Sequence, residues 1–303
     1  NLTLAGASPG GLWTLLGAGL DAVVKANDPN STITYQTTGG GFANAAMISE
    51  GRAEIGLIHD AELAIAAQGG EPFSAPIENL RTIGYLYDWA PMQFVTTRSF
   101  AEEHEVDSVD DFAAAQVPVR MTVNRAGNIT GQIASAIMAA AGADDEAIAQ
   151  WGGAVVQAGS SEQAGLLQNG RVDLYANGVF VGHSSIREIE NAPDIKLLSI
   201  PADVRAQIAE EFSIAEFTIP ADSYENQPEA IETLALGAVL IASAEMSEED
   251  AYTLTKALID NLDSIRSVHP AMADLDTTLL TRETAVPYHD GALRAYQEAG
   301  LIE

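Results

Sequence analysis

Five residues near the amino terminus have the spacing of a catalytic serine motif. Gly6-Ala7-Ser8-Pro9-Gly10 matches the G-x-S-x-G pattern in which a serine attacks an acyl carbon, and His289 could supply the base in a Ser…Asp…His order. The oxyanion hole of such enzymes uses the backbone N–H of the residue after the serine. That residue is Pro9, which has no N–H. The motif therefore does not predict a hydrolase.

Other patterns that could hold a cofactor or a metal are equally weak. Gly17-x-Gly19-x-x-Ala22 resembles a dinucleotide fingerprint, but it lies inside a helical pattern instead of after a strand. No G-K-[ST] phosphate loop occurs, and the chain has no cysteine. No two of the five histidines have a short spacing that would place them on one helix face. We expect neither a cofactor nor a metal.

Two basic side chains, His59 and Arg125, follow expected strands, a position that suits binding of an acidic molecule. His59-Asp60 follows an expected strand, so that either Asp60 caps the next helix or His59 contacts a ligand carboxylate. Arg125 stands between an expected strand and helix in a chain with only 14 basic residues. It either pairs with a neighbouring acid or clamps a substrate carboxylate with two hydrogen bonds. Tyr87 either packs in the core or covers a ligand.

Strand and helix patterns alternate around these residues. We expect strands at 2–5, 32–36 and 54–58, with helices at 12–26 and 42–50 between them. Such strand–loop–helix units predict a parallel sheet covered by helices. A strand pair at 80–87 and 92–97, interrupted at Pro91, is a candidate crossing between lobes, and the apolar run 234–244 is a strand or a buried helix. A second strand and helix follow at 117–123 and 130–141.

The pattern of the first lobe returns 119 residues later. Without gaps, residues 37–57 align with 156–176, so that Gly51-Arg52 meets Gly170-Arg171 and Glu54 meets Asp173. Either two βαβ units are alike by chance, or the chain has two lobes of related architecture. In open α/β sheets, ligands bind at the loops that follow the carboxyl ends of strands, where helix amino termini attract anions.

The charge of the chain excludes one class of partner. Forty-three acidic and 14 basic residues give a formal net charge of −29, which repels the phosphate backbone of nucleic acids. The acidic residues are scattered, as expected for solvated helix faces or for a surface adapted to a saline exterior. No apolar run reaches the 18 residues that a membrane-spanning helix needs.

Four segments resemble the TAXI-type substrate-binding proteins of tripartite ATP-independent periplasmic (TRAP) transporters. They are AGASPGG at 5–11, TTGGGFAN at 37–44, EGRAEIGL at 50–57, and VPYHDGA with YQEAG between 286 and 300. AGNIT at 126–130 departs from the glycine–serine–glycine–threonine run usual in that family, and His289 is expected to serve packing. The resemblance implies an α/β, two-lobed periplasmic-binding-protein-like (type II) fold, each lobe a mixed sheet flanked by helices and joined by a hinge. We expect one lobe at 1–88 plus 222–303 and the other at 89–221, with a ligand cleft between them.

The resemblance also implies a function. It predicts a monomeric periplasmic receptor, its signal peptide removed, that passes a small organic acid to sodium-coupled TRAP membrane subunits. Glutamate, glutamine, related dicarboxylates and 2-oxo acids are the implied solutes, and no catalysis is expected. A two-lobed enzyme, such as a transferase acting on a small acid, and a sensory ligand-binding module are the alternatives. The candidate ligand-binding residues are Ser8, Gly10, Gly11, Leu12, Thr38, Gly41, Asn44, His59, Tyr87, Arg125, Asn128, Thr130, Ser160 and Asn177.

Overall fold

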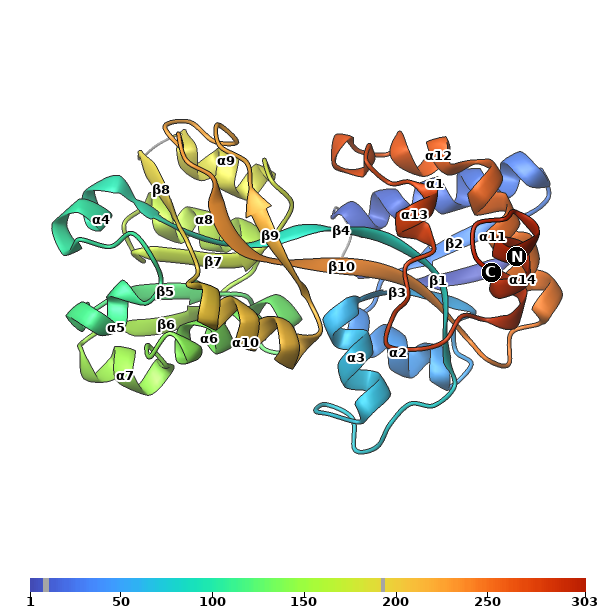
Figure 1. Cartoon of the computed structure of the whole chain (residues 1–303), viewed down its shortest axis with the longest axis horizontal. Coiled ribbons are helices and arrows are strands. Elements are labelled where there is room, and N and C mark those ends of the chain that lie inside the picture. Colours follow the sequence, from blue (N-terminus) through green and yellow to red (C-terminus); the bar gives the residue numbers. More distant parts are fainter. Residues whose placement is uncertain (8–10, 192–193) are drawn as a thin grey trace. The chain divides into compact units, whose positions relative to one another are not determined.

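The chain forms two compact units. The computed structural model describes residues 1–7, 11–191 and 194–303 (Figure 1). Unit 1 consists of residues 1–88 and 237–303, and unit 2 consists of residues 89–236. The chain leaves unit 1 within strand β4 (Leu80–Thr97) and returns to it within strand β10 (Ile231–Ser243). Unit 1 is therefore built from two distant segments of the sequence, whereas unit 2 is continuous.

Unit 1 is a mixed sheet between two helical layers. Strand β1 (Leu2–Ala5) lies parallel between β2 (Ile33–Gln36) and β3 (Ile55–His59), and the second half of β10 runs antiparallel to β3. Helices α2 and α3 lie on one side of this sheet, and α1, α11 and α12 on the other (Figure 1). The helices of unit 1 are α1 (Leu12–Asn27), α2 (Gly41–Ser49), α3 (Asp60–Gln68), α11 (Glu248–Asp260), α12 (Leu262–Arg266), η1 (Pro270–Met272), α13 (Thr277–Leu280) and α14 (Asp290–Glu298).

Unit 2 has the same layered plan. Strand β5 (Arg120–Val123) lies parallel between β6 (Ala154–Gln157) and β7 (Leu174–Gly178), and β4 runs antiparallel to β7. Strand β8 (Ile195–Leu198) pairs with β4, and β9 (Ala215–Ile219) pairs with the first half of β10. Helices α8 and α9 cover one side, and α6 and α10 the other (Figure 1). The helices of unit 2 are α4 (Arg98–His104), α5 (Asp111–Ala115), α6 (Ile129–Ala140), α7 (Asp145–Gln150), α8 (Ser160–Gln168), α9 (Ser184–Glu190) and α10 (Ala202–Phe212).

The repeat at an offset of 119 is confirmed in atomic detail. Helices α2 and α8, and strands β3 and β7, begin and end at positions related by that offset. After both helices the chain turns through a glycine with positive φ, 66° at Gly51 and 63° at Gly170. The acidic residue just before β3 or β7 also has the same role in both units, because its carboxylate accepts a backbone N–H from the neighbouring strand. Glu54 accepts the N–H of Thr3 in β1, and Asp173 accepts the N–H of Arg120 in β5.

Two boundaries differ from those expected. Strand β4 runs unbroken through Pro91, because a proline removes one N–H donor but keeps its carbonyl, which here accepts the N–H of Val179. The chain also returns to unit 1 at Gly237, not at residue 222. Residues 222–236 stay with unit 2 because β9 holds the first half of β10, and because the Thr233 hydroxyl donates to the carbonyl of Met92.

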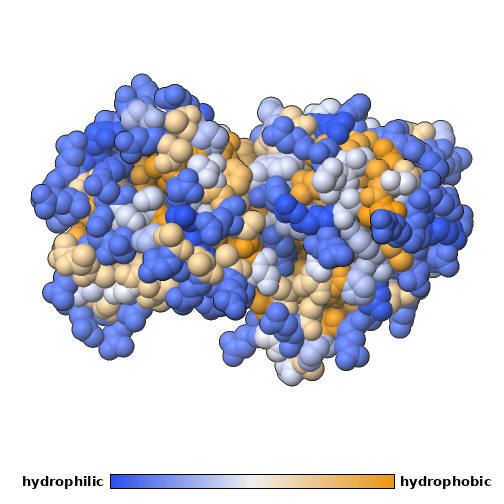
Figure 2. All heavy atoms as spheres, viewed as in Figure 1, coloured by the Kyte–Doolittle hydropathy of each residue, from blue (hydrophilic) through white to orange (hydrophobic). Residues whose placement is uncertain are grey.

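The face drawn in Figure 2 is mainly hydrophilic. Hydrophilic residues cover much of the face drawn in Figure 2, and hydrophobic residues form smaller areas between them. The exposed large hydrophobic side chains among the described residues are Leu15 and Val156. In the part of the chain that the structure describes, we find no helix of the length and apolar character needed to cross a membrane.

We predict that replacing Gly51 or Gly170 by alanine destabilises the protein by about 1 kcal/mol. This is the usual cost of holding a residue with a Cβ atom in the left-handed backbone conformation. The cost is conformational, because a Cβ atom at Gly51 or Gly170 would meet no other atom within 4 Å. Urea unfolding of the Gly51→Ala and Gly170→Ala variants measures it. The control is Gly165→Ala, which also has open space but lies inside α8. It should be neutral or stabilising, and equal losses in all three variants would contradict the explanation.

Candidate functional site

Each unit gathers loops at the carboxyl ends of its parallel strands. In unit 1 the loops after β1, β2 and β3 contribute Gly6, Ala7, Gly11, residues 37–41 and residues 59–62, which we call the unit 1 loop cluster. Parallel strands end at one edge of a sheet, so these loops belong to the same edge. Gly11 caps helix α1 and Leu12 is its first residue. The candidates Ser8 and Gly10 lie outside the described residues.

Asn44 holds the unit 1 loop cluster together. Its side chain is fully buried. The amide nitrogen donates to the carbonyl oxygens of Gly6 and Leu57, at 2.6 Å each, and the Thr38 hydroxyl lies 2.6 Å from the amide oxygen. Both amide N–H groups are thus used within the protein. Asn44 therefore positions the loops, and Thr38, which is partly exposed, is bound into the same network.

The loop after β3 carries a histidine and a buried acid. Glu62 is 4% exposed, and its Oε2 accepts the backbone N–H of His59 at 3.1 Å and lies 3.0 Å from His59 Nδ1. The contact with the His59 backbone is one half of a capping box at the start of α3, with His59 as the N-cap. In the other half the His59 side chain accepts the backbone N–H of Glu62. The expected alternative, a cap by Asp60, is wrong, because Asp60 is the first residue of the helix.

One aromatic ring, that of Trp13, packs against the histidine. The Trp13 and His59 ring centroids are 4.9 Å apart, and the indole N–H of Trp13 donates to the Tyr87 hydroxyl at 3.0 Å. Trp13 and Tyr87 are 7% and 5% exposed, whereas the His59 side chain retains 20%. His59 is therefore the member of this group that is available to a ligand. Tyr87 is buried, and its hydroxyl positions the Trp13 ring by accepting the indole N–H.

Asp60 joins both segments of unit 1. Its Oδ2 accepts the Tyr85 hydroxyl of β4 at 2.5 Å and the backbone N–H of Gly237 in β10 at 3.0 Å. The loss of hydration raises the pKa of Asp60 to about 6, against the opposing effect of the Tyr85 and Gly237 hydrogen bonds and of nearby His59. Gly237 must lack a side chain, because a Cβ atom there would collide with the Tyr85 hydroxyl.

The loops after β5, β6 and β7 form a second network, the unit 2 loop cluster, at residues 124–130, 158–163 and 177–183. Asn128 caps α6 by accepting the backbone N–H and the hydroxyl of Thr130. The Asn177 oxygen lies 2.8 Å from the Thr130 hydroxyl, and the Asn177 nitrogen donates to Ser160 and Gln163. The structure therefore brings four predicted residues together, with Thr130 and Asn177 buried and Asn128 exposed.

Gln163 is the counterpart of Asn44. It occupies the position that aligns with Asn44 at the offset of 119, it is fully buried, and its amide nitrogen lies 3.5 Å from the carbonyl oxygen of Ala176. That carbonyl aligns with Leu57, which accepts from Asn44. The prediction from sequence missed Gln163, although the ungapped alignment already contained the matching pair of amides.

Arg125 lies at the surface of the unit 2 loop cluster. Its side chain is 70% exposed, and its Nη2 pairs with the 59% exposed Glu162 at 3.1 Å. The structure thus contains the neighbouring acid that one interpretation of the sequence expected. The same exposure leaves most of the guanidinium open to contact with a solute. Exposed ion pairs of this kind contribute little to stability, so exchanging Glu162 for a solute would cost little.

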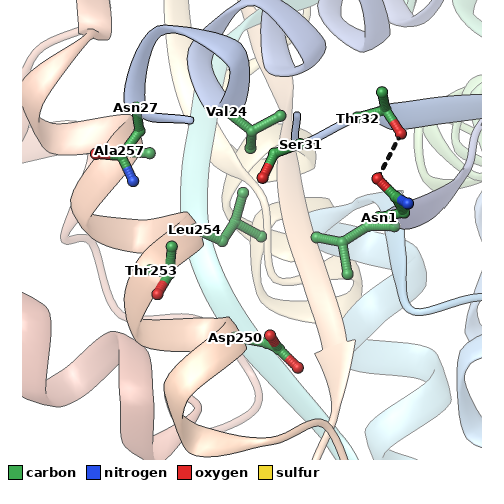
Figure 3. Close-up of a pocket in the computed structure, with 10 residues that line it drawn as sticks. Asn1, Val24, Asn27, Ser31, Thr32, Asp250, Thr253, Leu254 and Ala257 are labelled. Carbon is green, nitrogen blue, oxygen red and sulfur yellow. Dashed lines mark hydrogen bonds between the residues drawn. The ribbon is translucent and has the colours of Figure 1, made fainter. Parts of the chain in front are cut away.

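A small cavity lies elsewhere in unit 1, between the start of β1 and helices α1 and α11 (Figure 3). Its volume is about 80 Å³, and the Thr32 hydroxyl donates to Asn1 at its rim. Small-molecule sites usually measure about 300–1,000 Å³. Asn1 and Thr32 stand at the amino ends of β1 and β2, the opposite edge from the loop cluster. The cavity is therefore separate from the candidate loops.

Comparison with known proteins identifies the family and the fold. A model of the NMT1-like family matches residues 4–300, so the chain belongs to that family. Similar solved structures include MatC (Rpa3494) from Rhodopseudomonas palustris with bound malate, at 14% identity and a TM-score of 0.58, covering 99% of this chain and 96% of that one. A TctC solute binding protein from Polaromonas has 14% identity and a TM-score of 0.56, covering 99% and 95%. The periplasmic binding protein BugD has 13% identity and a TM-score of 0.54, covering 99% and 97%. These likenesses confirm the predicted periplasmic-binding-protein-like α/β fold.

We predict that Asp60 makes the protein less stable as the pH rises from about 4 to about 6. The pKa of Asp60 is raised from 3.8 to about 6 in the folded protein, so the folded state holds the proton more tightly than the unfolded state does. The stabilisation by the proton is complete below pH 4 and is lost by about pH 6. At about 1.4 kcal/mol for each pKa unit, it amounts to at most about 3 kcal/mol.

Urea unfolding of the wild type and of Asp60→Asn at several pH values tests this expectation. The asparagine cannot ionise, so the difference in unfolding free energy between the two proteins should change across that pH range. The exposed Asp274, which also lies in unit 1, provides the control for the loss of one acid through the Asp274→Asn variant. A constant difference for Asp60→Asn would show that burial does not raise its pKa.

Proposed function

We propose that this member of the NMT1-like family is an extracytoplasmic solute receptor that binds a small carboxylate and delivers it to a membrane transporter. The observation that carries the proposal is Arg125, whose guanidinium is 70% exposed in a loop at the carboxyl end of a parallel strand. A planar guanidinium matches a carboxylate with two parallel hydrogen bonds. Glu162, its present partner, is itself exposed and is readily displaced.

The comparisons support this class of function without specifying the solute. MatC was solved with malate, and the other two structures are described as a solute binding protein and a periplasmic binding protein. The resemblance of four sequence segments to TAXI-type proteins adds the proposal of a TRAP membrane partner and a periplasmic location. Within this proposal the protein acts as a monomer, and the solute is glutamate, a related dicarboxylate or a 2-oxo acid.

The proposed mechanism is capture by hinge closure, without a chemical reaction. The chain offers two covalent connections for a hinge, at Asp88–Trp89 and Leu236–Gly237. In the unit 1 loop cluster, His59 and Thr38 would contact the solute; in unit 2, Arg125 and Asn128 would do so. A ligand that binds one conformation more tightly than another shifts the protein toward it. Binding would thereby create the state that the membrane partner recognises.

We predict that Arg125→Ala weakens the binding of an acidic solute at least tenfold, a loss of about 1.4 kcal/mol. Isothermal titration calorimetry with malate, glutamate and pyruvate measures the affinity. Conversely, Glu162→Gln should strengthen binding, because it removes the acid that competes with the solute for the guanidinium.

Arg171→Ala is the matched control. Arg171 is exposed and also lies in unit 2, but it stands before β7, at the opposite end of the strand from the loop cluster. Its removal changes the net charge equally and should leave affinity unchanged. Equal affinity in Arg125→Ala and the wild type would exclude the carboxylate clamp. If the wild type bound none of the three acids, the proposed solute class would be wrong.

A further inference from the structure

Two buried amide side chains in the unit 2 loop cluster have a fixed orientation. The backbone carbonyl of Ala176 can only accept a hydrogen bond, and the amide nitrogen of Gln163 lies 3.5 Å from its oxygen. The Gln163 oxygen faces Asn177 and accepts one of its amide N–H groups at 3.0 Å. Gln163 is fully buried, and Asn177 is 1% exposed. Because the carbonyl cannot donate, it determines which way both amides are turned.

This orientation determines the role of Ser160, the first residue of α8. The amide nitrogen of Asn177 also donates to the Ser160 hydroxyl oxygen, at 2.8 Å. A hydroxyl carries a single hydrogen, and the oxygen of this one is engaged as an acceptor. Among the groups that the structure describes, none accepts the hydrogen of Ser160. Ser160 is partly exposed, so its hydrogen is available to an acceptor from outside the protein.

The fold does not explain this hydroxyl hydrogen. The N-cap of α8 is Gly159, and no side chain caps the helix from that position. The equivalent of Ser160 in unit 1, at the offset of 119, is Gly41, which begins its helix without a side chain. The Ser160 oxygen satisfies an N–H of Asn177, but its hydrogen has no such role in the protein.

Two neighbouring side chains have the same polarity. The Asn128 oxygen accepts the backbone N–H of Thr130 and lies 2.7 Å from its hydroxyl oxygen, which leaves the exposed Asn128 nitrogen as a donor. The guanidinium of Arg125 contains donors only. Ser160, Asn128 and Arg125 thus all offer hydrogen-bond donors at the loops of one unit, with the exposed Glu162 beside Arg125.

We propose that Ser160 is a specificity-determining residue whose hydroxyl donates to a carboxylate oxygen of the solute, and that Asn177 and Gln163 are the positioning residues that orient it. This inference rests on the proposed function, because it assumes that the acid group of the solute binds at the unit 2 loop cluster. It narrows that group to one that only accepts hydrogen bonds. A carboxylate meets this condition, whereas a carboxamide would direct its own N–H groups at the donors.

Removal of the hydroxyl tests the contact. Isothermal titration calorimetry compares malate, glutamate and pyruvate with the analogues in which an amide replaces a carboxylate. Ser160→Ala should weaken binding of the acids about tenfold, because a hydrogen bond to a charged group is stronger than one between neutral groups. The amide analogues should lose less, whereas a purely structural role would weaken both alike. Ser160→Thr keeps a hydroxyl and should keep the selectivity.

Ser99→Ala is the matched control. Ser99 is an exposed serine in the first turn of α4, also in unit 2, but it follows the end of β4 that pairs with the start of β7, away from the loop cluster. Its removal should leave every affinity unchanged. Unchanged binding of the acids by Ser160→Ala, or equal losses for the acids and their amides, would overturn the proposal.

Asn177→Leu tests the orientation of the hydroxyl. Leucine has a similar volume but cannot donate to Ser160, so affinity for the acids should fall severalfold. The loss in Asn177→Leu combined with Ser160→Ala should be no greater than in Ser160→Ala alone, because both changes remove the same contact. Losses that add would contradict the positioning role. The Ser160 variants decide the contact with the solute even where Asn177→Leu does not fold.

The variants distinguish a failure of this inference from a failure of the proposed function. If Arg125→Ala weakens binding of the acids and Ser160→Ala does not, the proposed function stands and this inference is wrong. If Ser160→Ala weakens binding and Arg125→Ala does not, the Arg125 clamp is wrong and the Ser160 contact stands. If the wild type binds none of the three acids, the solute class and the Ser160 contact are both wrong.

Discussion

A buried amide side chain that reaches from a helix to the adjacent strand is the interaction on which both units depend. Asn44 in α2 and Gln163 in α8 hold equivalent positions, and each directs its nitrogen at the equivalent carbonyl, of Leu57 or Ala176. A buried polar group without a partner costs about 1–3 kcal/mol, so each helix can take only the position that satisfies its amide. The loop that precedes each helix is fixed as a result, and with it the groups available to a solute.

Much of the plan of each unit follows from periodicity. The strand at 2–5 and the repeat at an offset of 119 were predictable because hydrophobic patterns and helix-ending glycines are local features. The continuous β4 was not predictable, since Pro91 is a usual breaker and its tolerance depends on a neighbouring strand.

Side-chain roles were harder to predict than elements. Asn44 was expected to bind a ligand, yet its amide is used within the fold, and the sequence does not reveal which way a polar side chain on a short helix faces. The capping role of Glu62 was missed, although a glutamate three residues after the N-cap is a local signal for the start of a helix. Arg125 stood out because basic residues are scarce in a chain of net charge −29, and it is the local arrangement of such groups, not the screened total charge, that acts on a small solute.

The discontinuity of unit 1 has a consequence for synthesis of the protein. Unit 2 is complete once residue 236 has been made, whereas unit 1 still lacks the second half of β10, the N–H of Gly237 that Asp60 accepts, and the helices that follow up to residue 303. Domains fold as units during translation. Residues 1–88 therefore remain incompletely folded, with one edge of strand β3 unpaired, while residues 89–236 fold first. The order of folding is the reverse of the order in which the two units begin.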